Sequence, residues 1–273
     1  MIKIKKINNN TVQAVPIEAT NKEDLKPIKG ADIFGEIFCN CFCLAKKKSG
    51  KSTLMYKIVK ETCDPRTKVF AFVSTLNKDK TWNTIQKYCE TKHIEFHGFT
   101  SIIDDDTGRN ILEELVVKLQ KEVPEEAEKP KKKKNFIILN EDSDDEEEKP
   151  KRYKYRVPEY LFILDDLSTE LSNPAVTSLL KKNRHFSSKV IISNQYWNDL
   201  AKSARKNMDY MIIFGAQPKD KLQEIHKELD LSLTFDEFYK IYKYATIKRF
   251  SFLYIDVVNE IYRRNFDVQI DLE

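Results

Sequence analysis

Ala45-Lys-Lys-Lys-Ser-Gly-Lys-Ser52 is the stretch that decides the fold of this 273-residue chain. It matches the pattern G-x-x-x-x-G-K-[ST], except that Ala45 stands in place of the first glycine. An apolar run at residues 38–44 precedes it, and a helical pattern at 51–61 follows it. Between a strand and a helix, this pattern directs backbone N–H groups and the positive end of the helix dipole at phosphates. We therefore predict a phosphate-binding loop.

Within this loop, Lys51 is predicted to reach the β- and γ-phosphates of a nucleotide, and Ser52 to offer its hydroxyl to Mg²⁺. The residues expected to bind the nucleotide are Ala45, Lys46, Lys47, Lys48, Ser49, Gly50, Lys51, Ser52 and Thr53. A chance lysine-rich turn is the competing interpretation. The chain has only 6 glycines, where average composition predicts about nineteen, so glycine at position 50 favours the functional interpretation. A positive φ at Ala45 would cost about 1–2 kcal/mol.

A second polar site follows the apolar run 160–164, which leads into Asp165 and Asp166. An acid at the end of such a strand lies beside the Mg²⁺ that Ser52 would hold, so Asp165 is predicted to bind the metal. Asp166 is predicted to orient or deprotonate the attacking water. The competing interpretation is an ordinary strand end, because Asp is common in turns.

Asn194 and Gln195 directly follow the apolar run 189–193, where they are expected to lie close to the γ-phosphate. Arg184 precedes that run, and Arg205 lies in the helix predicted after it. Arginine is scarce here among many lysines, and its planar guanidinium, with several N–H donors, suits phosphate recognition. For each of these residues the alternative is a surface charge or a helix cap.

Apolar runs and helical patterns alternate along the chain, which is typical of a parallel sheet covered by helices on both faces. The predicted strands are 38–44, 68–74, 160–164, 189–193 and 210–214. The predicted helices are 51–61, 81–92, 111–121, 219–229 and 235–244, the last with a capping box of Thr234 and Glu237. Two β-like runs follow at 250–256 and 266–270. We predict an α/β fold with a central, mostly parallel five-stranded sheet flanked by helices and a small C-terminal β extension.

Two segments interrupt this alternation. Residues 1–31 are rich in Lys and Asn and predict a flexible N-terminal arm. Residues 122–157 carry successive blocks of like charge, which repel one another and oppose packing, so they predict a disordered insertion. The remainder of 32–273 is predicted to be one nucleotide-binding domain, because the phosphate loop and Asp165 lie on either side of the insertion.

The overall composition restricts the function less than the motifs do. Lys and Arg total 47 against 43 Asp and Glu, so the net charge of +4 is compatible with a local basic face but does not establish nucleic-acid binding. No apolar run approaches the roughly 18 residues of a membrane helix. Five cysteines and a polar N-terminal stretch predict reduced thiols in an intracellular protein.

Two groups of residues resemble metal ligands only superficially. Residues 39–43 carry three alternating cysteines on one side of a strand, where burial beneath a helix is favoured over metal binding. Cys89, His93 and His97 would align only on one helix, whereas residues 94–99 look extended. We predict no metal site in either group.

Inside the insertion, residues 136–148 place a short β-prone apolar run before a block of acids. This pattern resembles a SUMO-interaction motif, which would add a strand to its partner's sheet. Ser143 precedes acids, as kinases such as casein kinase 2 prefer. The alternative is a solvated acidic tether.

Together, the lysine-rich phosphate loop, Leu164-Asp165-Asp166, Arg184-His185 and Ser193-Asn194-Gln195 resemble the genome-packaging ATPases of large eukaryotic DNA viruses and virophages. These are poxvirus-type members of the FtsK/HerA superfamily. Residues 205–207 and the closing stretch 252–267 are similar to the same family. The resemblance spans about 34–267 without the insertion. It departs at Ala45, and at Asp166, where many relatives of the fold carry Glu.

This resemblance implies an additional-strand P-loop fold, a homo-oligomeric ring, ATP and Mg²⁺, and double-stranded DNA in the pore. It implies an ATPase that translocates DNA into a capsid, with capsid or vertex proteins as partners, in the virion and the cytoplasmic virus factory of a eukaryotic host. Metal binding falls to Ser52 and Asp165. The implied catalytic residues are Lys51 (phosphates), Asp165 (metal), Asp166 (water), Gln195 (γ-phosphate) and Arg184 (a finger reaching the neighbouring subunit's nucleotide).

Two other functions remain compatible with the motifs. A P-loop nucleotide kinase would need an acceptor pocket and an arginine-bearing lid, but no arginine from a neighbour. A weakly hydrolysing capsid-assembly scaffold is suggested by Ala45 and by the crowded lysines of the loop.

Overall fold

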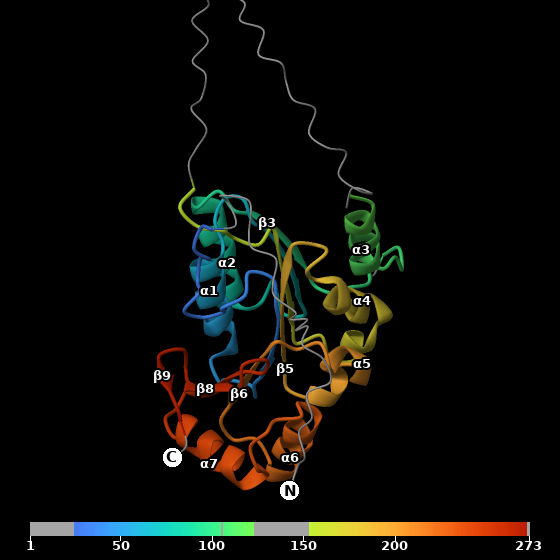
Figure 1. The fold of residues 1–273 in the computed structure, drawn as a ribbon. Coiled ribbons are helices and arrows are strands. Elements are labelled where there is room, and N and C mark those ends of the chain that lie inside the picture. The colour runs from blue at the N-terminus through green and yellow to red at the C-terminus, as the bar shows by residue number, and fades with distance from the viewer. Residues whose placement is uncertain (1–24, 105, 123–152, 272–273) are drawn as a thin grey trace, which may run out of the picture.

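The computed structural model describes residues 25–104, 106–122 and 153–271. They form a nine-stranded sheet with the order β3-β2-β4-β5-β1-β6-β7-β8-β9 (Figure 1). The strands are β1 (Asn40–Leu44), β2 (Lys68–Val73), β3 (Glu95–Phe99), β4 (Tyr160–Asp165), β5 (Ser188–Asn194), β6 (Tyr210–Phe214), β7 (Phe252–Asp256), β8 (Ile261–Arg264) and β9 (Val268–Gln269). The strands from β3 to β6 in this order are parallel, and β7 to β9 continue the sheet antiparallel.

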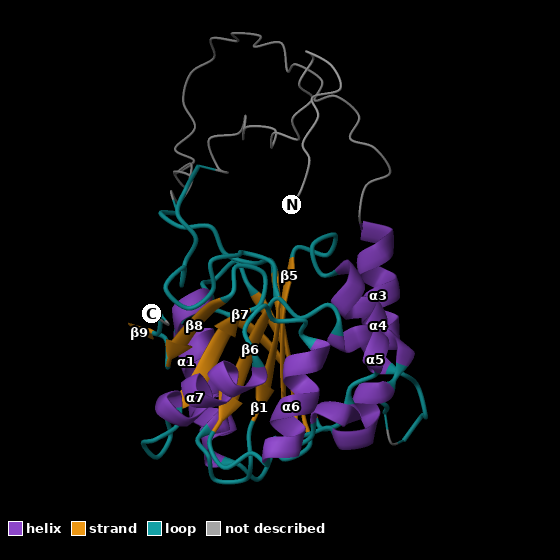
Figure 2. Ribbon diagram, turned by 60° about the horizontal axis from the view of Figure 1, so that its bottom comes forward, coloured by secondary structure: helices purple, strands orange, loops and turns teal. Residues whose placement is uncertain are grey.

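Helices cover both faces of the sheet (Figures 1 and 2). They are α1 (Lys51–Thr62), α2 (Lys80–Thr91), α3 (Ile111–Glu122), α4 (Pro174–Lys182), α5 (Lys202–Arg205), α6 (Lys219–Glu228) and α7 (Phe235–Ala245). One buried apolar cluster joins the sheet to α1 and α2, and the other joins it to α3 through α7. Alternate residues of β1 enter opposite clusters: Phe42 and Leu44 one, Cys41 and Cys43 the other. The central strands are therefore buried on both faces, as their continuous apolar runs predicted.

The strand order places the phosphate loop between two strand ends. β1 lies between β5 and β6, and β5 separates β1 from β4. In this register Leu44 is opposite Asn194, and Asp165 is opposite Ser193. The carboxyl ends of β1, β5 and β4 thus meet at one edge of the sheet. The strand inserted between β1 and β4 confirms the additional-strand arrangement.

The predicted α/β class and the C-terminal β extension are confirmed, and the structure adds detail to the sheet. All five predicted central strands are present, but the described sheet has nine strands because β3 joins its edge and β7 to β9 extend it. Residues 261–264 form a strand that no pattern predicted, while only two residues of the run 266–270 do so. Such short edge strands are half buried, so their hydrophobic pattern is weak.

The predicted arm and insertion overlap the described body at their inner ends. Ile28 pairs with Arg156 in an isolated parallel bridge, and the Lys29 amide donates to the Arg156 carbonyl over 2.9 Å. The Arg66 guanidinium lies over the ring of Tyr153, 4.0 Å from its centre. Residues 25–31 and 153–157 thus pack on the domain, and α3 extends to residue 122. The rest of both segments, including 136–148, lies outside the described residues.

The five cysteines are buried and free. Cys89 lies on α2, His97 on β3 and His93 in the turn between these elements. Among the described residues, no group of three or more His, Cys, Asp or Glu side chains converges as a metal cage would require. No helix in the described ranges is long and apolar enough to cross a membrane.

Candidate active site

The phosphate loop connects the buried end of β1 to the start of α1. Gly50 precedes α1 with φ 100°, a conformation that side chains with a Cβ rarely adopt, so the backbone itself requires glycine here. The left-handed residue of the lysine run is Lys48, with φ 62°. Ala45 has no positive φ, and its amide donates to the Asn194 carbonyl over 3.0 Å. The strain considered for alanine at this position therefore does not arise.

Lys51 lies between the two acids that end β4. Its Nζ atom is 3.1 Å from Asp165 Oδ1 and 3.1 Å from Asp166 Oδ2. Burial disfavours the charge of Lys51, but the two carboxylates outweigh burial and raise its pKa above the ordinary value. The ammonium is therefore charged at neutral pH and neutralises an acid pair that would otherwise repel itself.

The two acids differ in environment although they are neighbours in sequence. Burial raises the pKa of Asp165, and the charge of Lys51 opposes this rise only in part. Burial also acts on Asp166, but a hydrogen bond from Gln195 and the charge of Lys51 bring its pKa below the ordinary value. Asp166 has a left-handed φ of 59°, which ends the strand and lets both carboxylates reach Lys51. Asp166 is thus an ionised hydrogen-bond acceptor at the mouth of the site.

Two residues at the start of α2 also belong to this site, and sequence analysis missed both. The Ser52 hydroxyl donates to Asp79 Oδ2 over 3.0 Å, while Asp79 Oδ1 caps α2 by accepting from the Thr81 amide. The Trp82 indole N–H donates to Asp165 Oδ2 over 3.3 Å. An Asp before a helical pattern signals a cap, but no local signal shows that the cap faces Ser52.

Gln195 follows β5 and turns toward the acids. Its Nε2 atom donates to Asp166 Oδ1 over 3.1 Å. The preceding Asn194 is buried and donates instead to Asp199 Oδ2 over 2.7 Å, within its own loop. Of the two polar residues predicted near the γ-phosphate, Gln195 is therefore the one that contacts the acid pair.

Arg184 lies at the other end of the sheet. It precedes β5, its side chain is 66% exposed, and its closest described ion-pair partner is Asp209, 3.9 Å away at the start of β6. The length of β5, roughly 20 Å for seven residues, separates it from the phosphate loop of its own subunit. Within one copy of the chain, Arg184 therefore lies far from the phosphate loop.

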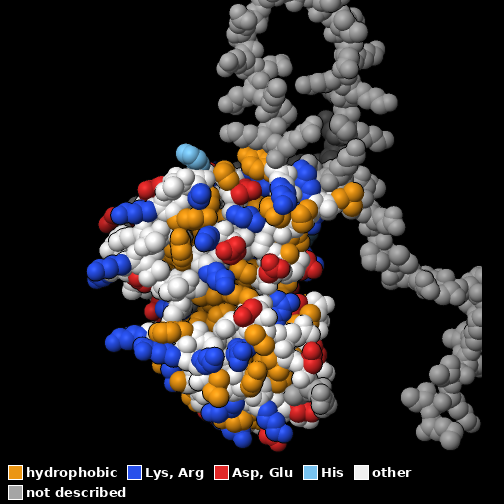
Figure 3. All heavy atoms as spheres, turned by 90° about the vertical axis from the view of Figure 1, so that its left-hand side faces the viewer, with side chains coloured by type: hydrophobic (Ala, Val, Ile, Leu, Met, Phe, Trp, Pro, Cys, Tyr) orange, Lys and Arg blue, Asp and Glu red, His pale blue; other side chains and the backbone are white. Residues whose placement is uncertain are grey.

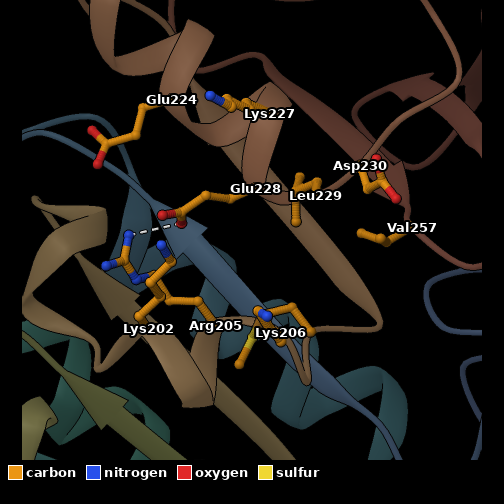
Figure 4. Close-up of a pocket in the computed structure, with 10 residues that line it drawn as sticks. Lys202, Arg205, Lys206, Glu224, Lys227, Glu228, Leu229, Asp230 and Val257 are labelled. Atoms are coloured by element: carbon orange, nitrogen blue, oxygen red, sulfur yellow. Dashed lines mark hydrogen bonds and ion pairs between the residues drawn. The ribbon is translucent and has the colours of Figure 1, made fainter.

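Arg205 is held in a network on the α5–α6 side (Figure 4). Its Nη1 atom donates to Glu228 Oε2 over 2.7 Å and to Asn198 Oδ1 over 2.8 Å, and its guanidinium faces the ring of Trp197. The Trp197 indole N–H donates to the same Glu228 oxygen over 2.6 Å. These bonds hold Arg205 against its own chain, beside a cavity of about 670 Å³.

An apolar cavity of about 720 Å³ opens beside the start of α1. Gly50, Thr53 and Lys57 line one side, and the aromatic rings of Phe250 and Phe266 line the other. Figure 3 shows the face over α1 and α2, on which hydrophobic side chains gather among Lys and Arg side chains. A flat heterocycle attached to phosphates bound at Gly50 would reach these rings.

Comparisons with known proteins identify the fold. No protein-family model matches the chain, and no curated protein matches its sequence. The genome packaging NTPase B204 from Sulfolobus turreted icosahedral virus 2, solved with AMP, aligns over 87% of this chain and 100% of its own, with a TM-score of 0.52 and 16% identity. Its complex with ATP-gammaS aligns over 86% and 98%, with a TM-score of 0.51 and 16% identity. The DNA-packaging ATPase B204 from Sulfolobus Turreted Icosahedral Virus aligns over 86% of this chain and 98% of its own, with a TM-score of 0.50 and 15% identity. At these identities the likeness shows a shared P-loop NTPase fold.

Proposed function

We propose that this protein is an ATPase that moves double-stranded DNA into a viral capsid. The observation that carries the ATPase activity is the position of Lys51 at the head of α1, 3.1 Å from oxygens of both Asp165 and Asp166. A lysine, a helix N-terminus and an ionised acid then surround the place where a γ-phosphate would lie. The genome-packaging role rests on likeness to the B204 structures.

Each residue of the site has a distinct task in this proposal. The backbone N–H groups around Gly50 and the ammonium of Lys51 bind the phosphates. Asp166, ionised and fixed by Gln195, accepts a hydrogen bond from the attacking water and aligns it with the γ-phosphate. Gln195 senses the γ-phosphate, because a bound phosphate competes with Asp166 for its amide. The rings of Phe250 and Phe266 take the adenine base.

Ser52 at the head of α1 and Asp165 at the end of β4 carry donor atoms of the kind that Mg²⁺ takes. Ser52 and Asp165 present oxygen atoms, and Mg²⁺ is ordinarily bound by one or two protein oxygens together with phosphates and waters, not by a complete protein cage. Bound with ATP, the ion would neutralise charge on the β- and γ-phosphates. Asp79 accepts a hydrogen bond from the Ser52 hydroxyl, which leaves a lone pair of the hydroxyl oxygen free for the metal.

The wider assembly is proposed on the same basis. Copies of the chain form a ring around DNA, and Arg184 reaches the nucleotide of the neighbouring copy. Capsid or vertex proteins bind the ring in the virion and in the cytoplasmic virus factory.

ATP turnover with and without double-stranded DNA tests this function. We expect the full chain to hydrolyse ATP with Mg²⁺ and DNA to accelerate it. Lys51→Ala should abolish turnover and keep the fold, whereas Lys60→Ala, an exposed lysine at the other end of α1, should retain it. Turnover in Lys51→Ala would contradict the assignment of the site. Phosphoryl transfer to a nucleoside monophosphate would indicate a kinase instead, and weak turnover unaffected by DNA would indicate an assembly scaffold.

A further inference from the structure

A third cavity, of about 530 Å³, lies beside the phosphate loop and is lined by cations and amides together with apolar and aromatic side chains. It is bounded by the loop, by the segment after β5 and by the start of α6. The polar residues that line it are Lys46, Lys47, Gln195, Asn198, Gln217 and Lys221. Among the described residues that line it, none carries a carboxylate. The polar part of this lining suits an anion and not a cation.

Three donors in this cavity form no described ion pair or hydrogen bond. Lys46 and Lys47 are exposed and form no ion pair within the described ranges, although the charge of Lys47 contributes to lowering the pKa of Asp166. The Nε2 atom of Gln217 is buried without a hydrogen-bond acceptor. A buried donor without an acceptor is costly, and an anion in the cavity would relieve that cost.

The N-terminus of α6 adds the positive end of a helix dipole to the cavity. Pro218 precedes this ten-residue helix and provides no side-chain cap, so the first amides of α6 lack the usual acceptor. Lys221, one turn into the helix, pairs with Glu224 over 3.6 Å at the surface. A surface pair of this kind is worth little, so Lys221 remains available to a phosphate.

The cavity adjoins the nucleotide site, with which it shares Lys46, Lys47 and Gln195, but it lies on the other face of the sheet from α1. Leu44 lines it and belongs to the apolar cluster shared with α3 through α7, whereas α1 and the Gly50 side of the loop lie on the opposite face of the sheet. Gln195 connects the two places, because it lines the cavity and also donates to Asp166. An anion in the cavity would therefore be adjacent to the group that aligns the attacking water.

The rim of the cavity carries an aromatic side chain suited to a nucleic acid. Tyr196 is 64% exposed and directly follows Gln195, whereas the neighbouring Trp197 is buried. An exposed tyrosine among lysines is able to pack on a sugar or donate to a phosphate oxygen. Free inorganic phosphate would leave that exposed ring without a role.

We propose that this cavity is a second phosphate site, which binds a backbone phosphate of DNA through Lys46, Lys47 and Lys221, with Tyr196 against the adjoining sugar. This inference rests on the proposed function and adds to it where DNA touches the subunit. DNA bound here would reach Gln195, so binding is coupled directly to the water-aligning Asp166.

The experiment measures binding of a short fluorescent DNA duplex to the full chain by anisotropy, at several salt concentrations and without nucleotide. Lys221→Gln should weaken binding equally for duplexes of different sequence and lower the slope of log K against log salt by about 1. Tyr196→Ala should weaken binding without a change in slope. Both substitutions leave the nucleotide residues in place, so the affinity for ATP should be unchanged.

Three matched variants serve as controls. Lys227→Gln removes a lysine from the same helix, but at the other cavity (Figure 4), and should bind DNA like the wild type. Tyr244→Ala removes a tyrosine that is 50% exposed elsewhere and should also have no effect. Glu224→Gln frees Lys221 from its surface partner and should strengthen binding or leave it unchanged.

Normal DNA binding by Lys221→Gln and Tyr196→Ala would overturn the site and leave the proposed function standing. Failure of the wild type to bind DNA would overturn both the site and the DNA part of that function. A second measurement titrates the protein with inorganic phosphate. If phosphate binding depends on Lys221 and DNA binding does not, the DNA assignment is wrong. A change in oligomeric mass of Lys221→Gln with unchanged DNA affinity would show a subunit contact and also overturn the proposal.

Discussion

The ammonium nitrogen of Lys51 lies 3.1 Å from a carboxylate oxygen of Asp165, although 114 positions separate the two residues in the chain. Without a nucleotide, this lysine neutralises the acids of β4. In the proposed ATPase, phosphates that enter the site would compete with Asp165 and Asp166 for this ammonium. The same lysine would thus contact the acid pair before a nucleotide binds and the phosphates afterwards.

Asp166→Asn should separate binding from chemistry. Asparagine keeps an oxygen that accepts from Gln195, but it has no charge with which to align the water. We expect turnover to fall about 10²–10⁴-fold while the affinity for ATP with Mg²⁺ stays near that of the wild type. Single-turnover kinetics and equilibrium binding check this. If binding fell and the chemical step did not, Asp165 and Asp166 would have exchanged roles.

Asp79→Asn should alter the response to Mg²⁺. Asparagine still caps α2, but it presents an amide group or a weaker acceptor to the Ser52 hydroxyl, so the hydroxyl loses its fixed orientation. The Mg²⁺ concentration for half-maximal turnover should rise about 10–100-fold, with an unchanged Tm. Asp79→Ala should raise it similarly and also cost about 1 kcal/mol of stability through the lost cap. An unchanged Mg²⁺ requirement in both variants would refute this role.

Arg184→Ala should be nearly inactive and still bind ATP. An arginine that stabilises the transition state in a neighbouring subunit is worth roughly 10³–10⁵ in rate. Mixed with Lys51→Ala subunits, Arg184→Ala should regain partial activity, because some interfaces then combine an intact phosphate loop with an intact Arg184. Lys182→Ala, an exposed cation on the preceding helix, is the control.

Turnover should also rise with protein concentration as rings assemble. Normal activity of Arg184→Ala would reject this residue and leave Arg205 as the next candidate, although Glu228 holds Arg205 in place. Turnover independent of concentration would count against the ring.

Phe250→Ala should weaken the binding of ATP but not the binding of inorganic triphosphate. The ring of Phe250 is 55% exposed beside the phosphate loop, so its removal leaves the core intact. A stacked base is worth about 1–3 kcal/mol, so ATP affinity should fall roughly tenfold or more. Ile247→Ala, an exposed apolar residue in the same loop, is the control. Equal losses for both ligands would place the base elsewhere.

The buried thiols should make the fold sensitive to alkaline pH. Burial raises the pKa of Cys63 from 9.0 to about 11. Between these two values the unfolded chain loses this proton and the folded chain keeps it, so the contribution of Cys63 to stability is complete below about 9 and is lost as pH rises toward 11. The difference in unfolding free energy between wild type and Cys63→Ala should therefore shrink across this range, as urea titrations would measure. A constant difference would show that the thiol does not ionise on unfolding.

The phosphate loop, the strand ending in two acids and the alternation of strand and helix were all predictable from sequence. Each depends on contiguous residues: Gly50-Lys51-Ser52 sets a turn and a helix start, Thr234 and Glu237 cap a helix reciprocally, and buried parallel strands require continuous apolar runs. Local patterns of this kind report backbone conformation and burial. They fixed the fold class and identified Lys51, Asp165, Asp166 and Gln195 as neighbours at one sheet edge.

Only the tertiary structure could decide which distant groups meet. It brought Asp79 to Ser52 and Trp82 to Asp165, added β3 and β8 to the sheet, and placed Arg184 at the end opposite the phosphate loop. These relations depend on strand order and on the direction in which each side chain leaves its element. A short capping turn or a half-buried edge strand has the same local sequence pattern whatever its position in the fold. Its partners are therefore determined only when the whole sheet has assembled.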